Sequence, residues 1–68
     1  MKVKYFTDTD TLYIQLNDRP AAQTTELNEN VLLDLDRDGK VVALTVEHAA
    51  SATGGPGKLD FSYEATAA

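Results

Sequence analysis

Residues 31–46 have the sequence VLLDLDRDGKVVALTV, and this stretch decides the fold. On each side of its polar centre, apolar residues recur at every second position, which is typical of a β-strand with one buried face. The centre, Asp36-Arg37-Asp38-Gly39, has the composition of a tight hairpin connection, because glycine adopts positive φ without a steric penalty. The stretch therefore predicts two antiparallel strands that share an apolar face.

The same period of two appears earlier in the chain. Residues 2–5 and 12–16 alternate apolar with other side chains, and the polar run over residues 7–11 predicts a turn between them. Pro20 ends this hairpin, which is the first in the chain, since proline cannot donate to a strand ladder. Residues 21–26 are small and polar, with Thr24 and Thr25 suited to an extended segment. Four strands joined in sequence order predict a four-stranded antiparallel β-meander, in a mainly β or α+β domain.

The C-terminal part differs in composition. Residues 47–52 predict a helical turn or short helix, which the glycine-rich residues 54–57 end. Residues 59–63 again alternate and predict a fifth short strand. We therefore expect an antiparallel sheet domain over residues 1–50. Residues 51–68 are expected to form a glycine-rich link and a short apolar tail that covers the sheet or joins an oligomer.

Eleven apolar side chains fall on one face of the predicted sheet. They are Val3, Tyr5, Leu12, Ile14, Leu16, Val31, Leu33, Leu35, Val42, Leu44 and Val46. Burial of a large aliphatic side chain contributes roughly 1.5–3 kcal/mol, and a single open sheet cannot cover its own face. The chain has 68 residues and no cysteine, so its core is small and no disulfide supports it. We therefore expect a homo-oligomer, preferably a dimer, with a further protein partner as the alternative.

The charge pattern narrows the class of partner. Eleven acidic and six basic residues give a formal net charge of −5, and the basic residues are scattered along the chain. A nucleic-acid interface needs clustered lysine and arginine, so no nucleic-acid partner is expected. No apolar run approaches the roughly 20 residues that cross a bilayer, and the N-terminal stretch is unlike a signal peptide. We therefore expect a cytoplasmic protein with no membrane partner.

The sequence YFTDTDTLYIQL over residues 5–16 resembles the opening of a family of small prokaryotic proteins, catalogued as domain-of-unknown-function family 2283. The similarity continues at Pro20, Thr25-Glu26, Val31-Leu32-Leu33-Asp34-Leu35-Asp36 and Gly39, and covers roughly residues 2–50. Its most specific part combines Asp10-x-Leu12-Tyr13-Ile14 with Asp34-x-Asp36-x-x-Gly39.

The resemblance implies a fold but no assigned activity. Members resemble the small partners encoded beside toxin-like genes, which implies a protein-binding role of antitoxin type. The family's last strand typically carries Gly-Ile-Glu, whereas this chain has Ala43-Leu44-Thr45, so the role of that glutamate is not carried over. The family usually continues into a helix after this strand, and here the glycine-rich link intervenes.

The segment 34–39 also matches the first six positions of an EF-hand loop, with acids at positions one, three and five and glycine at six. Position twelve is Thr45 rather than a bidentate glutamate, and strand patterns replace the flanking helices. Asp34, Asp36 and Asp38 are therefore only weak candidates for a calcium site. The alternative interpretation is a solvated β-turn stabilised by aspartates.

Few residues suggest catalysis. His48 is the single histidine and no acid is placed to orient its ring, while Asp8 and Asp10 share an open turn. We therefore predict no catalytic residue and no cofactor, and the leading hypothesis is a non-enzymatic protein-interaction module. The alternative is a small ligand-binding domain or enzyme whose site forms between protomers, from Asp8, Asp10, Glu47 and His48.

Aromatic and large apolar residues also occur off the main apolar face. Phe6, Tyr13 and Leu32 are expected on the second face of the sheet, and Phe61 and Tyr63 in the tail. These five are the predicted partner-binding residues. Cross-strand packing beneath the tail is the alternative interpretation.

Overall fold

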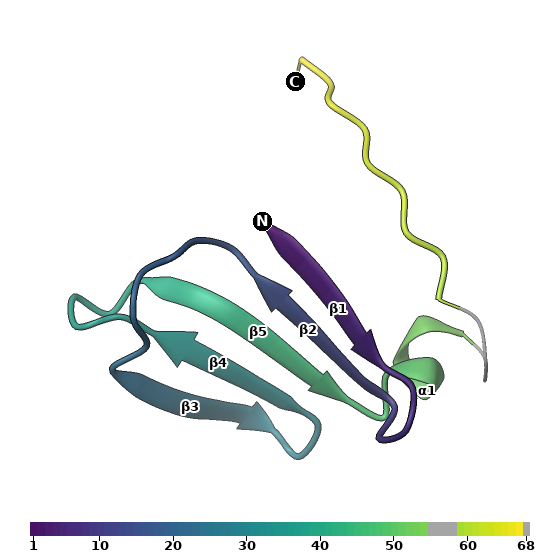
Figure 1. The fold of residues 1–68 in the computed structure, drawn as a ribbon, viewed down its shortest axis with the longest axis horizontal. Coiled ribbons are helices and arrows are strands. Elements are labelled where there is room, and N and C mark those ends of the chain that lie inside the picture. The colour runs from purple at the N-terminus through teal and green to yellow at the C-terminus, as the bar shows by residue number, and fades with distance from the viewer. Residues whose placement is uncertain (55–58, 68) are drawn as a thin grey trace.

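The computed structural model describes residues 1–54 and 59–67, and its elements are one antiparallel sheet and a short helix, both within residues 2–53 (Figure 1). The elements are β1 (Lys2–Phe6), β2 (Thr11–Gln15), β3 (Gln23–Asn28), β4 (Val31–Leu35), β5 (Val41–Glu47) and α1 (Ala49–Thr53). The mainly β class predicted from the alternating pattern is confirmed, as are the β1–β2 and β4–β5 hairpins.

The order of the strands differs from the predicted meander. Across the sheet the order is β1-β2-β5-β4-β3, so β2 neighbours the last strand instead of the one that follows it in sequence. The longest strand, β5, has an apolar residue at five of seven positions and takes the centre, where it pairs with both β2 and β4. β5 has a hydrogen-bonded neighbour along each edge, and it contains the buried residues Val42 and Ala43.

The strand that is additional to the four predicted ones is β3, and it lies in a segment whose composition is polar. It pairs only with β4, and an edge strand with one neighbour needs little apolar surface. Thr24 Oγ1 donates a hydrogen bond of 2.7 Å to Asp34 Oδ1 across this pair. The tail, predicted as a strand over residues 59–63, is instead extended without a sheet partner, and Phe61 and Tyr63 are 68% and 83% exposed. Whether the tail joins an oligomer stays a prediction.

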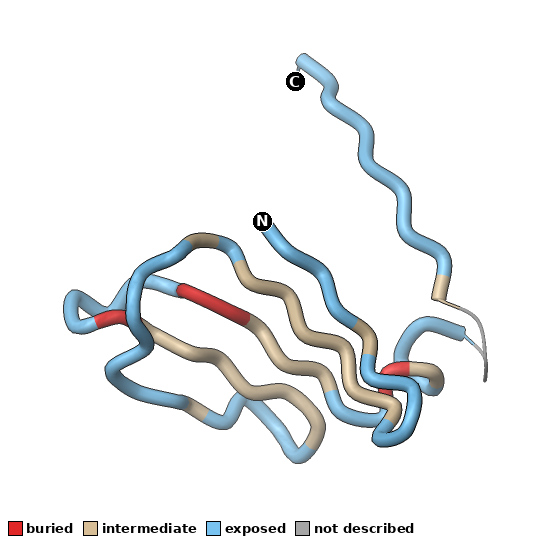
Figure 2. Tube along the Cα trace, viewed as in Figure 1, coloured by how far each residue is buried: buried red, intermediate tan, exposed pale blue. Residues whose placement is uncertain are grey.

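All five strands belong to one sheet, and the chain measures 36 × 34 × 18 Å along its principal axes. Among the hydrophobic residues that the structure describes, only Val42, Ala43 and Ala49 are buried (Figure 2). No large side chain in this part of the chain is fully buried. The described residues therefore lack a conventional two-layer core. They also include no helix with the length and apolar composition to cross a membrane.

The predicted short helix is present as α1, and two residues with positive φ frame it. His48 precedes it with φ 56°, and Gly54 ends it with φ 106°, donating its N–H to the Ala50 carbonyl. Gly54 stops the helix after five residues because glycine enters the left-handed region at little cost. The helix is fastened to the β1–β2 turn, since the Ala49 N–H donates to the Asp10 carbonyl over 3.0 Å.

Candidate interaction surface

Two rows of cross-strand neighbours form what we call the apolar face. The first row is Val3, Ile14, Leu44, Leu33 and Thr25; the second row is Tyr5, Leu12, Val46, Val31 and Asn28. Directly paired residues of antiparallel strands point to the same side of a sheet, so each row lies on one face. The two rows share that face because their members on β1, Val3 and Tyr5, are two positions apart. None of the ten is buried in the single chain, and Val3 is 39% exposed. Eight of the eleven residues predicted for an apolar face are in these two rows, which are left partly open to solvent. The other three are not: Val42 is buried, Leu16 lies after the end of β2, and Leu35 pairs with Val41 beyond a register shift.

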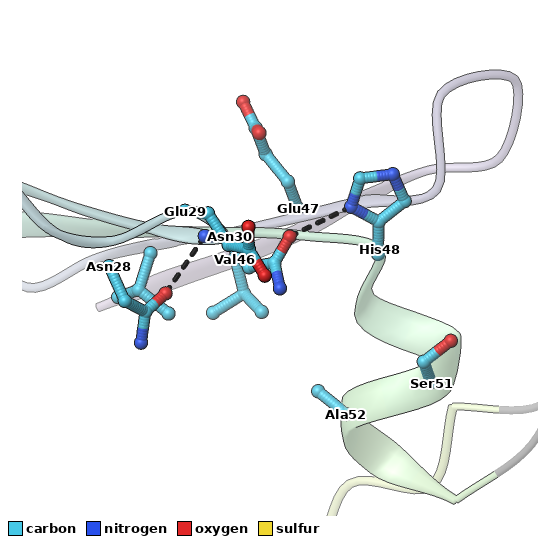
Figure 3. A pocket seen from close by; sticks show the side chains of 9 residues that line it. Asn28, Glu29, Asn30, Val46, Glu47, His48, Ser51 and Ala52 are labelled. Atoms are coloured by element: carbon cyan, nitrogen blue, oxygen red, sulfur yellow. Dashed lines mark hydrogen bonds between the residues drawn. The ribbon is translucent and has the colours of Figure 1, made fainter.

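The helix α1 stands at one end of the apolar face. Figure 3 shows that α1 and Val46 lie on the same side of the sheet, whereas Glu47 points to the other side. A hollow of about 500 Å³ separates the helix from the β3–β4 turn, and its lining includes Val31, Val46 and Ala52. The hollow is therefore the end of the apolar face, bounded by the helix.

The opposite face carries the charged side chains of the strands. One of its rows is Lys4, Tyr13, Thr45, Leu32 and Glu26, and a second is Lys2, Gln15, Ala43, Asp34 and Thr24. Phe6 lies on this face, 46% exposed, at the end of β1. The structure thus brings Phe6, Tyr13 and Leu32 to one face, as predicted, and places Phe61 and Tyr63 in the exposed tail. Their role in binding a partner stays a prediction.

Asp10 joins three parts of the chain at the end of the sheet. Its Oδ1 accepts hydrogen bonds from the Tyr5 hydroxyl over 2.5 Å and from the Ala50 N–H over 3.0 Å. The bond to Asp10 is the main cause that raises the pKa of the Tyr5 hydroxyl. Asp10 has φ 54°, a conformation that aspartate tolerates better than most residues. It therefore acts as a structural clamp between β1 and α1.

The polar residues suggested for an interfacial catalytic site do not meet in the single chain. Asp10 is engaged with Tyr5 and Ala50, while His48 Nδ1 lies 2.9 Å from Asn30 Oδ1. Asp8 and Glu47 are exposed. Whether any of these groups converge between protomers stays a prediction.

The carboxylate of Asp36 accepts hydrogen bonds from the backbone of the β4–β5 turn. Its Oδ1 accepts from the N–H groups of Asp38 and Lys40, each over 2.9 Å, and its Oδ2 receives the Arg19 Nε–H over 2.7 Å. The Lys40 N–H is the main cause that lowers the pKa of Asp36, and the Asp38 N–H and Arg19 assist. Burial of the carboxyl opposes them but is outweighed. Only 6% of Asp36 is exposed. This aspartate is therefore a structural anchor of the turn.

The three calcium candidates are not brought together. Both oxygens of Asp36 face their own turn and Arg19, and Asp34 accepts a hydrogen bond from Thr24 on the charged face. Asp38 is exposed. Across residues 1–54 and 59–67, no three acidic or histidine side chains are grouped to hold a metal ion. The residues with EF-hand spacing therefore lie at the end of β4 and in the turn that follows it, where the Gly39 N–H donates to the Asp36 carbonyl.

The lowered pKa of Asp36 predicts a specific pH dependence. Because the folded chain favours the charged carboxylate, its stabilising effect is complete above the ordinary pKa and is lost as pH falls through the lower folded value. We expect wild type to melt at a higher temperature than Asp36→Asn between about pH 5 and 7, with the difference shrinking below about pH 4. Melting curves measured across this range test it. A difference that is unchanged at pH 2, or one that Asp38→Asn reproduces, would contradict the assignment.

A family model described as "Protein of unknown function (DUF2283)" matches residues 2–49, about two thirds of the chain. The chain belongs to the DUF2283 family. The match spans all five strands and reaches the first residue of α1, and the exposed tail lies beyond it. Comparisons with curated proteins and with solved structures gave no match.

Several residues that carry the DUF2283 resemblance have structural tasks in this chain. Asp10 clamps α1 to the first hairpin, and Asp36 closes the β4–β5 turn. Gly39 occupies the left-handed region of that turn with φ 81°. Sequence reasoning identified Asp36 only as a metal candidate or a turn residue. Its partner Arg19 lies 17 positions away, and no local pattern indicates that pairing.

Proposed function

We propose that this DUF2283 protein is a cytoplasmic, non-enzymatic protein-interaction module that binds its partner through the apolar face. The observation that supports this most is a sheet with one apolar face whose ten residues all stay at least partly exposed in the described structure. Leaving such a face in water sacrifices part of the roughly 1.5–3 kcal/mol that each large aliphatic side chain contributes when it is fully buried. A partner that covers the face recovers this free energy, and binding is then coupled to stability.

The distribution of polar groups supports an interaction role further. The carboxylates of Asp10 and Asp36 in this DUF2283 chain accept hydrogen bonds from neighbouring backbone and side-chain donors. They fix the turns at the two ends of the sheet and so hold the apolar face in shape. The antitoxin-type partner role implied by the family resemblance belongs to the same class of function.

The proposal requires the apolar face to be open in the free chain. We expect a soluble nitroxide to broaden the methyl NMR signals of Ile14 and Leu44 strongly, at a dilution where sedimentation gives the monomer mass. The methyl signals of Ala43 and Ala49, which are 0% exposed, are the internal control and should change little. Equal protection of all four residues would mean that the chain seals its own face, and the interaction role would fail.

A further inference from the structure

The single chain exposes more surface than a protein of its mass normally does. Its accessible surface is 5350 Å² at 7.4 kDa. A monomeric globular protein of this size exposes about 4,200 Å². The excess of about 1,100 Å², to which the extended tail contributes, compares with the roughly 800 Å² that each partner buries in a standard interface. An interface of ordinary size therefore covers an area comparable to this excess, which the open sheet and the exposed tail share.

The chemistry of the apolar face favours a partner with the same surface. None of its ten residues is charged, although the whole chain carries a net charge of −5. A basic partner would be attracted to the acids of the turns and the opposite face, and would gain nothing from these rows. Two copies of an uncharged apolar face, in contrast, are complementary to each other and keep most of their like charges apart.

From these observations, and resting on the proposed interaction role, we propose that the occupant of the apolar face is a second copy of this chain. The two sheets pack face to face about 10 Å apart across a two-fold axis, as sheets in β-sandwiches do. The central strand β5 of one copy then lies over β5 of the other, and Leu44 is near the axis. The interface is isologous, so each substitution on it acts twice.

The position of α1 favours one direction of the two-fold axis that relates the two copies. α1 stands on the apolar side at the end of β5. An axis parallel to the strands would bring both helices to the same end of the pair, so that both would stand between the two sheets there. An axis perpendicular to β5 places them at opposite ends, where each helix bounds the partner's sheet. The hollow beside Val31, Val46 and Ala52 then receives the far end of the partner sheet.

Sedimentation velocity of the full chain, from about 1 to about 300 μM protomer, tests the proposal. Two variants of the same edge strand separate the two faces: Val3→Lys on the apolar face and Phe6→Lys on the opposite face, at residues 39% and 46% exposed. Both sites are partly solvated, so neither substitution buries a charge in the monomer. We expect a wild-type dimer, a dissociation constant raised about tenfold or more by Val3→Lys, and little change with Phe6→Lys.

Two outcomes would overturn the dimer. A wild type that stays monomeric over the whole range, with the Ile14 and Leu44 methyl groups still open to the nitroxide, would leave the interaction role intact but reject the second copy as the occupant. A dimer weakened by Phe6→Lys and not by Val3→Lys would place the contact between the two copies on the opposite face of the sheet instead.

Discussion

Replacing Leu44 with lysine is expected to convert the dimer to a monomer, with a dissociation constant raised by about a thousandfold or more. Leu44 is the middle residue of the first apolar row and lies on the central strand β5. The two-fold axis brings both copies of residue 44 together, so two ammonium groups would be desolvated side by side. Light scattering at a concentration where wild type is dimeric measures the effect.

The matched control for this variant is Thr45→Lys. It introduces the same side chain one residue along β5, on the opposite face between Tyr13 and Leu32. Its dissociation constant should remain within about threefold of wild type. Circular dichroism separates loss of association from loss of folding, and where Leu44→Lys does not fold, the milder Val3→Lys carries the comparison. A folded Leu44→Lys that dimerises like wild type would show that the apolar face is not the interface.

Removing the Asp36 carboxylate is expected to give the largest loss of stability among the polar substitutions. Asp36→Ala leaves the N–H groups of Asp38 and Lys40 and the Arg19 guanidinium without their acceptor. Asp36 itself is buried, and its loss removes three hydrogen bonds to a charged acceptor, so we expect the melting temperature to fall by roughly 10 °C or more. Thermal melts at equal protomer concentration measure this, because the stability of a dimer depends on concentration.

Asp38→Ala is the control in the same turn. The side chain of Asp38 is exposed and accepts no hydrogen bond within the described structure, so its removal should shift the melting temperature by about 2 °C or less. Equal shifts for the two variants would mean that Asp36 is not the anchor of the β4–β5 turn. Added calcium should protect neither variant, since the aspartates of this loop do not converge.

Much of the sheet could be predicted because period-two alternation reports which side chains share a face. Residues 31–46 indicated β4, β5 and their turn directly, and Leu12 and Ile14 indicated the apolar side of β2. Alternation does not report which strands become neighbours. That choice depends on how much apolar surface each arrangement covers, and it places β5 between β2 and β4.

The strand β3 could not be predicted with the same rule, because an edge strand gains its stability from one ladder and from side-chain bonds such as Thr24 to Asp34. In the tail, by contrast, the same rule predicted a strand that the structure does not have. Its alternation of Leu59, Phe61 and Tyr63 is strand-like, yet alternation alone supplies no neighbouring strand.

The apolar face could be predicted from the sequence, whereas the polar contacts that hold the turn and the helix at its end could not. The apolar face followed from the period-two spacing, which predicted eight of its ten residues. The clamp at Asp10 depends on contacts with Tyr5 and with Ala50, the latter 40 positions away in the sequence. Long-range pairs of this kind leave no periodic signal.

The most direct test of the central claim uses a sample that mixes isotope-labelled and unlabelled full-length chains. In a filtered NMR experiment we expect intermolecular nuclear Overhauser effects between the methyl groups of Leu44 and Ile14 on different copies. Effects from these methyl groups that are entirely intramolecular, and that lead to Phe61 and Tyr63 of the same chain, would show that the tail covers the face and would contradict the account.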